Sequence, residues 1–193
     1  ESPRQRLLKW ASVHPDMHIR QDVPYAEALV GSVSSKFCFV PRGKSAWSSR
    51  LFRVLFAKCV PVLLNDDYEV PFLSFLRRDW FIRWPMREVS EDLADQLREL
   101  GQGPIPERMV QRAEVPKCWY VWHPPTMDSG HYDLDEGALD EVCPEWRTKN
   151  AYVAVMALLF DKKRLVKSSS KTFYRPQADG SSVSFLATEQ SDQ

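Results

Sequence analysis

A strand–loop–helix–strand pattern constrains the fold of this chain more than any other feature of its sequence. The apolar run Phe37–Val40 has the length and β-rich composition of a buried strand, and Pro41 and Gly43 break it where a chain in a parallel sheet must turn. A helix over about residues 49–58 and a second apolar strand over residues 60–64 follow directly. Two strands joined by such a short helical crossover predict a right-handed connection and a parallel sheet.

The loop between the first strand and the helix carries groups that bind anions. Ser48 or Ser49 is placed to cap the helix, which leaves backbone N–H groups and the positive end of the helix dipole facing a ligand above the strand. Arg42, Lys44 and Arg50 add mobile cations to the same turn. The loop therefore predicts a site for an anion such as a diphosphate.

Four blocks in this region resemble the exostosin-type glycosyltransferases in their order and spacing. The blocks are Phe37–Gly43, Trp47–Leu51, Cys59–Val62 and Glu69–Phe72, and the resemblance covers about residues 25–85. Several blocks at matching separations are a more specific signal than a single glycine-rich loop. The resemblance implies the GT-B fold, in which two Rossmann-like halves face each other across a cleft, and it implies that this chain is the carboxy-terminal, donor-binding half.

The resemblance also implies which residues contact the diphosphate of a nucleotide sugar. These are Arg42, Gly43, Ser48, Ser49 and Arg50. Cations and helix N–H groups can stabilise the charge on a departing diphosphate without a metal ion. From the residues alone, the alternative stays open that this stretch is only a tight turn followed by a helix cap.

A carboxylate follows the second strand at Glu69, where it can accept hydrogen bonds from ribose hydroxyls. The resemblance supports this nucleotide-binding role, and the alternative is a solvated loop acid. Asp66 and Asp67 are left unassigned. Adjacent side chains usually point apart, and the two aspartates form no Asp-X-Asp pattern, so no metal ion and no other cofactor is expected.

The irregular stretch predicted over residues 116–147 holds further candidate groups. Possible metal ligands are Cys118, His123, Asp128, His131 and Asp133. Their spacing matches no familiar zinc pattern, which favours structural or surface roles. The same stretch contains Trp119, Trp122 and Trp146, which are equally suited to stacking on a sugar and to filling a core.

The four cysteines are Cys38, Cys59, Cys118 and Cys143, and they include no Cys-X-X-Cys pair. Cys38 and Cys59 lie on or beside neighbouring predicted strands, where buried thiols are favoured, although a lumenal compartment would permit a bridge. Cys118 and Cys143 bracket the irregular stretch, which is a more natural place for a disulfide. Whether that pair is bridged is left open.

The chain of 193 residues is long enough for one well-buried domain. We predict an α/β, Rossmann-like nucleotide-sugar-binding domain over residues 1–166. Residues 167–193 are rich in Ser, Lys, Gln and Asp and are predicted to form mainly a disordered tail. The 26 basic and 26 acidic residues balance, and no basic stripe is interleaved with aromatic residues, so nucleic acid is not an expected partner.

Other elements follow from periodicity and helix-capping signals. Helices are expected over residues 4–11, over 25–34 against the sheet, over 91–100 between Ser90 and Gly101, over 106–113 and over 150–164, and a third strand is expected over 80–84. No apolar run reaches the roughly 18 residues of a membrane span, and the charged start is unlike a signal sequence. Golgi-lumenal or membrane association is therefore implied by the resemblance alone, through a segment absent here.

The leading interpretation is the donor-binding portion of an inverting, exostosin-like glycosyltransferase. Such an enzyme would move a hexosyl or glycuronosyl unit from a UDP-sugar to a glycan or polysaccharide acceptor. The general base is expected from the amino-terminal GT-B half or from a partner subunit, so no catalytic residue is assigned. The alternative is a non-catalytic module that serves as a partner subunit or a glycan-binding surface. An unrelated nucleotide-binding protein ranks last, because neither Gly-X-Gly-X-X-Gly nor a P-loop pattern occurs.

Overall fold

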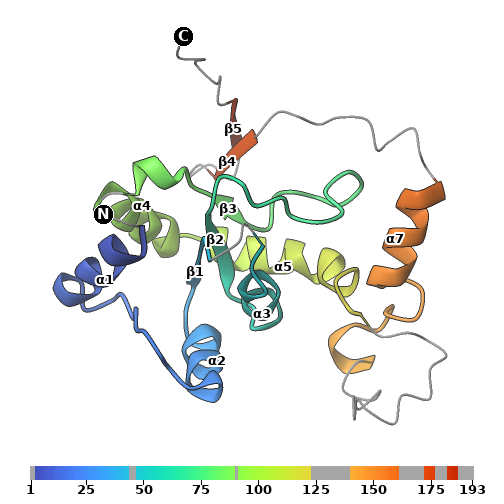
Figure 1. Cartoon of the computed structure of the whole chain (residues 1–193), viewed down its shortest axis with the longest axis horizontal. Coiled ribbons are helices and arrows are strands. Elements are labelled where there is room, and N and C mark those ends of the chain that lie inside the picture. Colours follow the sequence, from blue (N-terminus) through green and yellow to red (C-terminus); the bar gives the residue numbers. More distant parts are fainter. Residues whose placement is uncertain are drawn as a thin grey trace.

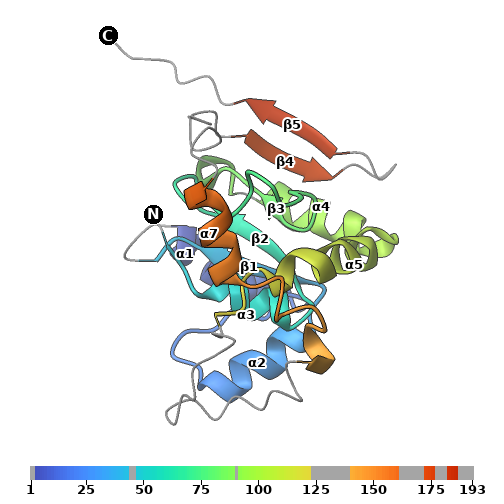
Figure 2. The same cartoon turned by 90° about the vertical axis from the view of Figure 1, so that its right-hand side faces the viewer.

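The computed structural model describes residues 3–43, 47–89, 91–122, 140–160, 172–176 and 182–186, with its elements labelled in Figures 1 and 2. In chain order these elements are α1 (Pro3–Val13), α2 (Tyr25–Val33), β1 (Phe37–Pro41), α3 (Arg50–Phe56), β2 (Val60–Leu64), β3 (Ile82–Arg83), a short 3-10 helix η1 (Met86–Glu88), α4 (Glu91–Gln102), α5 (Ile105–Cys118), α7 (Ala151–Phe160), β4 (Thr172–Pro176) and β5 (Ser182–Leu186). The predicted α/β fold with a parallel sheet and flanking helices is confirmed.

Strand β2 lies at the centre of a three-stranded parallel sheet with the order β1-β2-β3. Phe37 of β1 lies opposite Val60 of β2, and Val62 of β2 lies opposite Ile82 of β3. Every residue of β2 is buried. A continuous apolar run is what a parallel strand requires when helices cover both of its faces.

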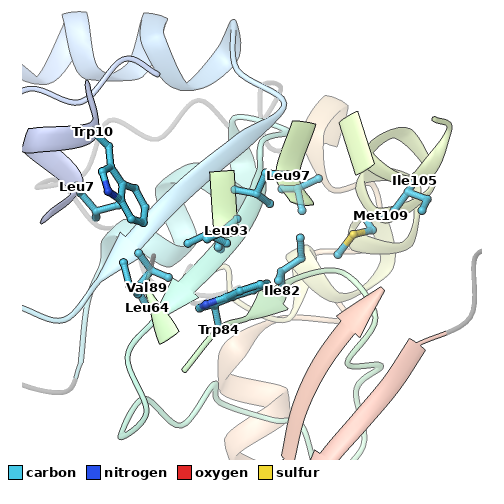
Figure 3. Packing of buried hydrophobic residues seen from close by; sticks show 12 residues of the cluster. Leu7, Trp10, Leu64, Ile82, Trp84, Val89, Leu93, Leu97, Ile105 and Met109 are labelled. Atoms are coloured by element: carbon cyan, nitrogen blue, oxygen red, sulfur yellow. The ribbon is translucent and has the colours of Figure 1, made fainter. Parts of the chain in front are cut away.

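The two faces of β2 pack against different helices. Val60, Val62 and Leu64 belong to one buried cluster, and Leu63 belongs to another, because successive side chains of a strand point to opposite faces. Figure 3 shows the first cluster, to which α1 and α4 contribute Leu7, Trp10, Leu93 and Leu97. The second cluster receives Leu51, Val54 and Leu55 from α3. The sheet is therefore the middle layer, and α5 contributes residues to both clusters.

A tight turn leads from α3 into β2. The amide of Cys59 donates to the carbonyl of Val54 at 3.0 Å, and the amide of Lys58 donates to the carbonyl of Leu55 at 3.1 Å. Lys58 takes the left-handed conformation, with φ of 57°, that this type of helix ending requires. The turn returns the chain to the sheet with only three residues between the end of α3 and the start of β2.

Cys38 of β1 and Cys59 form a disulfide, with their Cα atoms 5.8 Å apart. Buried thiols were favoured at these two positions, and this expectation is wrong. The register that sets Phe37 opposite Val60 brings the two side chains together across the start of the neighbouring strands. The pairing depends on this register, which composition alone does not specify.

Helix α2 forms where a helix was expected, but it does not pack into the core. None of its residues is buried, and Tyr25, Val30 and Val33 are 61%, 69% and 66% exposed. Figures 1 and 2 show α2 beyond the start of β1, beside α3. α2 therefore contacts α3, which itself packs on the sheet, and the expected position of α2 against the sheet is wrong.

Helices α4 and α5 both run further than their sequence signals indicate. α4 continues through Gly101 to Gln102, and Ser90, its expected cap, lies outside the described residues. A Cβ atom at Gly101 would lie 3.4 Å from the ring of Phe37, which is an ordinary packing distance, so this end of α4 lies beside the start of β1. α5 continues past Pro116 to Cys118, into the stretch expected to be irregular.

Strands β4 and β5 form an antiparallel pair, with Thr172 opposite Leu186 and Pro176 opposite Ser182. The pair lies within residues 167–193, for which a mainly disordered tail was predicted, and β4 lies beside β3. β4 contains threonine and two aromatic residues and β5 contains valine and phenylalanine, which are residue types that favour extended backbone. The domain boundary at residue 166 stays a prediction.

Candidate functional site

The carboxyl ends of β1, β2 and β3 meet at one edge of the sheet, as parallel strands require. Arg42 and Gly43 follow β1, residues 65–69 follow β2, and Arg83 ends β3. The amide of Arg42 donates to the carbonyl of Leu64 at 3.2 Å, which extends the pairing of β1 and β2 by one residue. This edge holds two of the predicted site residues, Arg42 and Gly43, and the loop that carries Glu69.

Arg42 forms an ion pair with Asp67, which was left unassigned from the sequence. The two side chains are 43% and 45% exposed. The side-chain oxygen of Asn65 accepts a hydrogen bond from the amide of Asp67 at 3.2 Å, which fixes the start of the loop. An exposed ion pair contributes about 0–1 kcal/mol. The guanidinium of Arg42 is therefore oriented by Asp67 and can still be drawn to a more highly charged anion.

Arg83 fixes the backbone of the loop that follows β2. Its buried guanidinium donates to the carbonyl of Asn65 at 3.2 Å and to the carbonyl of Tyr68 at 2.6 Å. Burial lowers the pKa of Arg83, and the nearby carboxylates of Asp66 and Glu69 oppose that effect. The exposed side chain of Glu69 thus extends from a loop whose backbone is tied to β3 by a buried cation.

The turn before α3 is tied to the same loop. The hydroxyl of Tyr68 donates to the carbonyl of Ser48 at 3.2 Å. Burial raises the pKa of Tyr68 to about 12, so its phenol keeps its proton at neutral pH. Tyr68 therefore connects the turn that contains Ser48 to the loop that contains Glu69, the two segments that carry the predicted site residues.

Ser48, and not Ser49, caps α3. The hydroxyl oxygen of Ser48 accepts from the amide of Arg50 at 3.3 Å, whereas the side chain of Ser49 makes no capping bond. The carbonyl of Ser48 accepts from the amide of Leu51 at 3.4 Å. These first amides are used within the turn of a seven-residue helix. Without a ligand the amides of Arg50 and Leu51 are therefore engaged within the turn, and the expectation that helix amides face an anion stays a prediction.

Arg50 lies on the first turn of α3 with an exposed side chain. The surrounding protein atoms partly bury its guanidinium and lower its pKa, and Arg53 and Arg4 lower it further. The charged neighbours that act on this pKa are therefore both cations. Such a cluster attracts anions. Arg4 comes from α1 and was missed because nothing local in the sequence links α1 to α3.

The remaining candidate groups are Asp66, at the same edge, and the possible metal ligands. The carboxylate of Asp66 accepts from the amide of Met86 at 3.1 Å, which gives it a structural role. Within the described ranges, no group of three or more His, Cys, Asp or Glu side chains is arranged to hold a metal ion. Lys44 and the candidate ligands His123, Asp128, His131 and Asp133 lie outside the described residues.

The three tryptophans of the predicted stacking platform lie in different surroundings. Trp146 is buried, with its indole N–H donating to Asp140 at 2.9 Å. Trp119 packs edge-on against Phe75, and Trp122 is exposed beside Tyr152. Trp146 therefore belongs to the core, which was the alternative left open from the sequence.

Comparison with known proteins decides the family. The model of the exostosin GT47 domain matches residues 3–100, which is half of the chain and includes the whole edge described above. The chain belongs to the exostosin GT47 family. The prediction from the sequence motifs is confirmed.

Individual relatives match segments of different lengths. A probable glycosyltransferase of Arabidopsis thaliana is 40% identical over 40% of this chain and 17% of its own length. Exostosin-1c of Danio rerio is 49% identical over 31% of this chain and 7% of its own length. A probable arabinosyltransferase of A. thaliana is 24% identical over 71% of this chain and 28% of its own length. The matched segments thus span only a small part of these relatives.

No solved structure matches the chain significantly. In the part of the chain that the structure describes, no helix is both long enough and apolar enough to span a bilayer.

Proposed function

We propose that this chain supplies the donor-binding portion of an exostosin-like glycosyltransferase with GT-B architecture. In this proposal Arg42, Gly43, Ser48, Ser49 and Arg50 contact the diphosphate of a UDP-sugar, and Glu69 accepts hydrogen bonds from the ribose. Membership of the exostosin GT47 family supports the reaction class. The observation that carries the proposal is that Arg42 and the loop bearing Glu69 lie at the carboxyl edge of a parallel sheet, where α/β folds bind nucleotides.

The proposed chemistry needs stabilisation of negative charge on the leaving UDP. An acceptor hydroxyl attacks the anomeric carbon, a general base takes the hydroxyl proton, and the bond to UDP breaks with inversion at that carbon. The guanidinium groups of Arg42 and Arg50 would offset the charge that develops on the diphosphate, without a metal ion or cofactor. Arginines suit this role better than lysines, because the rigid, planar guanidinium can donate to two phosphate oxygens at once.

The proposal includes a specific role for the ion pair between Arg42 and Asp67. The diphosphate carries more charge than a carboxylate and competes for the guanidinium. Asp67 would orient Arg42 before the donor arrives. The donor diphosphate would then share the guanidinium of Arg42 with Asp67 or displace Asp67 from it. Tyr68 and Arg83 keep the loop in place during that exchange.

The remaining parts of the reaction are proposed to come from outside this chain. The acceptor surface and the general base would belong to an amino-terminal GT-B half or to a partner subunit. The acceptor would be a glycan or polysaccharide, the transferred unit a hexosyl or glycuronosyl group, and the location the Golgi lumen or its membrane. These assignments rest on the family alone.

Calorimetric titration with UDP and UDP-sugars, in the presence of a metal chelator, tests the donor site. We expect saturable binding that falls about tenfold or more in Arg50→Ala and in Glu69→Ala, since each loses a charge-assisted hydrogen bond of about 1.5–3 kcal/mol. Matched controls are Arg108→Ala and Glu107→Ala, which remove the same side-chain types from exposed positions on α5. The controls should bind UDP as the unaltered chain does.

Absence of UDP binding by a sample that circular dichroism shows to be folded would contradict the proposal. So would equal loss of affinity in the site variants and their controls. Binding of a glycan but not of UDP would instead support the alternative of a non-catalytic, glycan-binding module.

A further inference from the structure

Cys118 and Cys143 lie side by side in a small buried cluster outside the proposed donor site. Cys118 ends α5, Cys143 precedes the segment that leads into α7, and their exposed fractions are 5% and 0%. Val121 and Trp146 complete the cluster, and Phe56 of α3 packs against it. Two segments well separated in the sequence therefore meet at a pair of thiols.

The side chains of Cys118 and Cys143 are neighbours within this buried cluster. The Cys143 side chain, together with the nearby Lys117 ammonium, lowers the pKa of Cys118. The Cys118 side chain, together with burial, raises the pKa of Cys143. The thiol group of Cys118 also lies 3.9 Å from the carbonyl of Glu114. Cys118 is thus the sulfur that more readily becomes a thiolate, and Cys143 is its immediate neighbour.

The same chain already holds the disulfide between Cys38 and Cys59. Disulfides of this kind form and persist in oxidising compartments, and thiols in contact with each other are seldom left reduced there. We propose that Cys118 and Cys143 form a second disulfide, which joins the end of α5 to the segment before α7.

The bond can form by exchange with a small disulfide such as oxidised glutathione. The thiolate of Cys118 attacks one sulfur of that disulfide, which releases one glutathione thiolate and leaves Cys118 in a mixed disulfide. Cys143 then loses its proton to solvent and attacks the sulfur of Cys118, which releases the second glutathione. The two cysteines lose two electrons, and the glutathione disulfide gains them. Since both thiols are buried, exchange takes place during folding or through local opening.

The cross-link would have a defined structural effect. Phe56 is the last residue of α3, the helix that begins at Arg50. A disulfide within the cluster would restrain the surface on which the end of that helix rests. It would also keep the segment before α7 attached to the end of α5.

Peptide mapping of the chain secreted from eukaryotic cells tests the proposal. Free thiols are alkylated in denaturant without reductant before digestion and mass spectrometry. We expect a linked peptide that contains Cys118 and Cys143, with the Cys38–Cys59 peptide as an internal control for oxidising conditions. Recovery of alkylated Cys118 and Cys143 alongside an intact Cys38–Cys59 peptide would overturn the proposal, as would linkage of either residue to another cysteine.

Single variants test whether Cys118 reacts first and Cys143 second. The starting protein is purified with Cys118 and Cys143 reduced. After addition of oxidised glutathione, Cys143→Ser should accumulate a glutathione adduct on Cys118, because the second step is removed. Cys118→Ser should form an adduct on Cys143 at least tenfold more slowly. Faster modification of Cys143 than of Cys118 would overturn the assigned order. The unaltered chain should end with no adduct and with two fewer thiols than before.

Discussion

The hydroxyl of Tyr68 donates to the backbone carbonyl of Ser48 at 3.2 Å, which joins the loop after β2 to the turn before α3. Tyr68 is 2% exposed, so its side chain lies inside the protein and the bond itself is partly buried. The proposed ribose contact and the proposed diphosphate contacts come from these two segments. Their relative position therefore depends on one buried side chain that would not itself touch the donor.

Replacing Tyr68 with phenylalanine removes this bond and leaves the ring in place. We expect Tyr68→Phe to lower the free energy of unfolding by about 0.5–1.5 kcal/mol, as for an ordinary internal hydrogen bond. Urea denaturation measures the change. Tyr152→Phe is the matched control, because Tyr152 is 42% exposed on α7 and should change the stability little. An equal effect of both substitutions would contradict the role given to Tyr68.

Replacing Arg83 should have a larger effect than replacing an exposed arginine. Arg83→Met keeps much of the side-chain volume but leaves the carbonyl of Tyr68 without its arginine donor and the carbonyl of Asn65 with only the 3.4 Å bond from the amide of Tyr68. We expect a loss of about 2–4 kcal/mol in the free energy of unfolding, since an unpaired buried group costs about 1–3 kcal/mol and a hydrogen bond from a charged donor contributes about 1.5–3 kcal/mol.

The matched control for Arg83→Met is Arg20→Met, which removes an exposed ion pair with Glu27. It should cost no more than about 1 kcal/mol. Chemical denaturation of both variants gives the comparison. A loss at Arg83 no greater than that at Arg20 would show that Arg83 does not support the loop.

The disulfide between Cys38 and Cys59 should stabilise the sheet by restricting the unfolded chain. The bridge joins residues 21 positions apart, for which the chain-entropy relation gives about 3 kcal/mol. The double variant Cys38→Ser/Cys59→Ser should unfold at a correspondingly lower denaturant concentration. Adding reductant should bring the unaltered chain close to the variant and should leave the variant almost unchanged. Equal stability of the variant and the oxidised chain would contradict this prediction.

The pair formed by Asp16 and Arg98 should make stability depend on pH in the acid range. Both guanidinium contacts, at 2.8 and 2.9 Å, favour the carboxylate and lower the pKa of Asp16 from 3.8 to about 2. Because the folded-state pKa is the lower one, the stabilisation is fully present above about pH 4 and is lost as the pH falls towards 2. Asp16→Asn should therefore flatten the fall in stability across this range.

Urea unfolding midpoints at several pH values between about 2 and 5 measure this dependence. Glu107→Gln, at an exposed position on α5, is a suitable control and should retain the acid dependence of the unaltered chain. If Asp16→Asn lost stability on acidification as steeply as the unaltered chain, the proposed linkage would be wrong.

Local signals predicted the elements of the sheet well. The apolar runs gave β1, β2 and the short β3, and the helix periodicity gave α2, α3, α4 and α7, with ends that differ by a few residues. The same signals did not say that α2 stays outside the core. Whether an apolar helix face is buried depends on which helices pack against the sheet, and in this protein α3 does so.

The candidate site was predictable where it depends on residues that follow a strand. Arg42 and Glu69 could be located because carboxyl ends of parallel strands lie at one edge. Asp67, Tyr68 and Arg83 acquire their roles only through contacts between loops. Arg83 ends the third strand, and its position at the same edge is the one signal that could have identified it.

The sequence by itself determined the α/β class, the order of strand and helix around residues 37–64, and the family of the protein. Those properties are contained in short runs, periodicities and spacings along the chain. The tertiary structure alone decided that Cys38 bonds to Cys59, that Arg42 pairs with Asp67, and that Tyr68 reaches Ser48. Each of these contacts depends on strand register and helix placement, which arise from the burial of many side chains together and not from any local pattern.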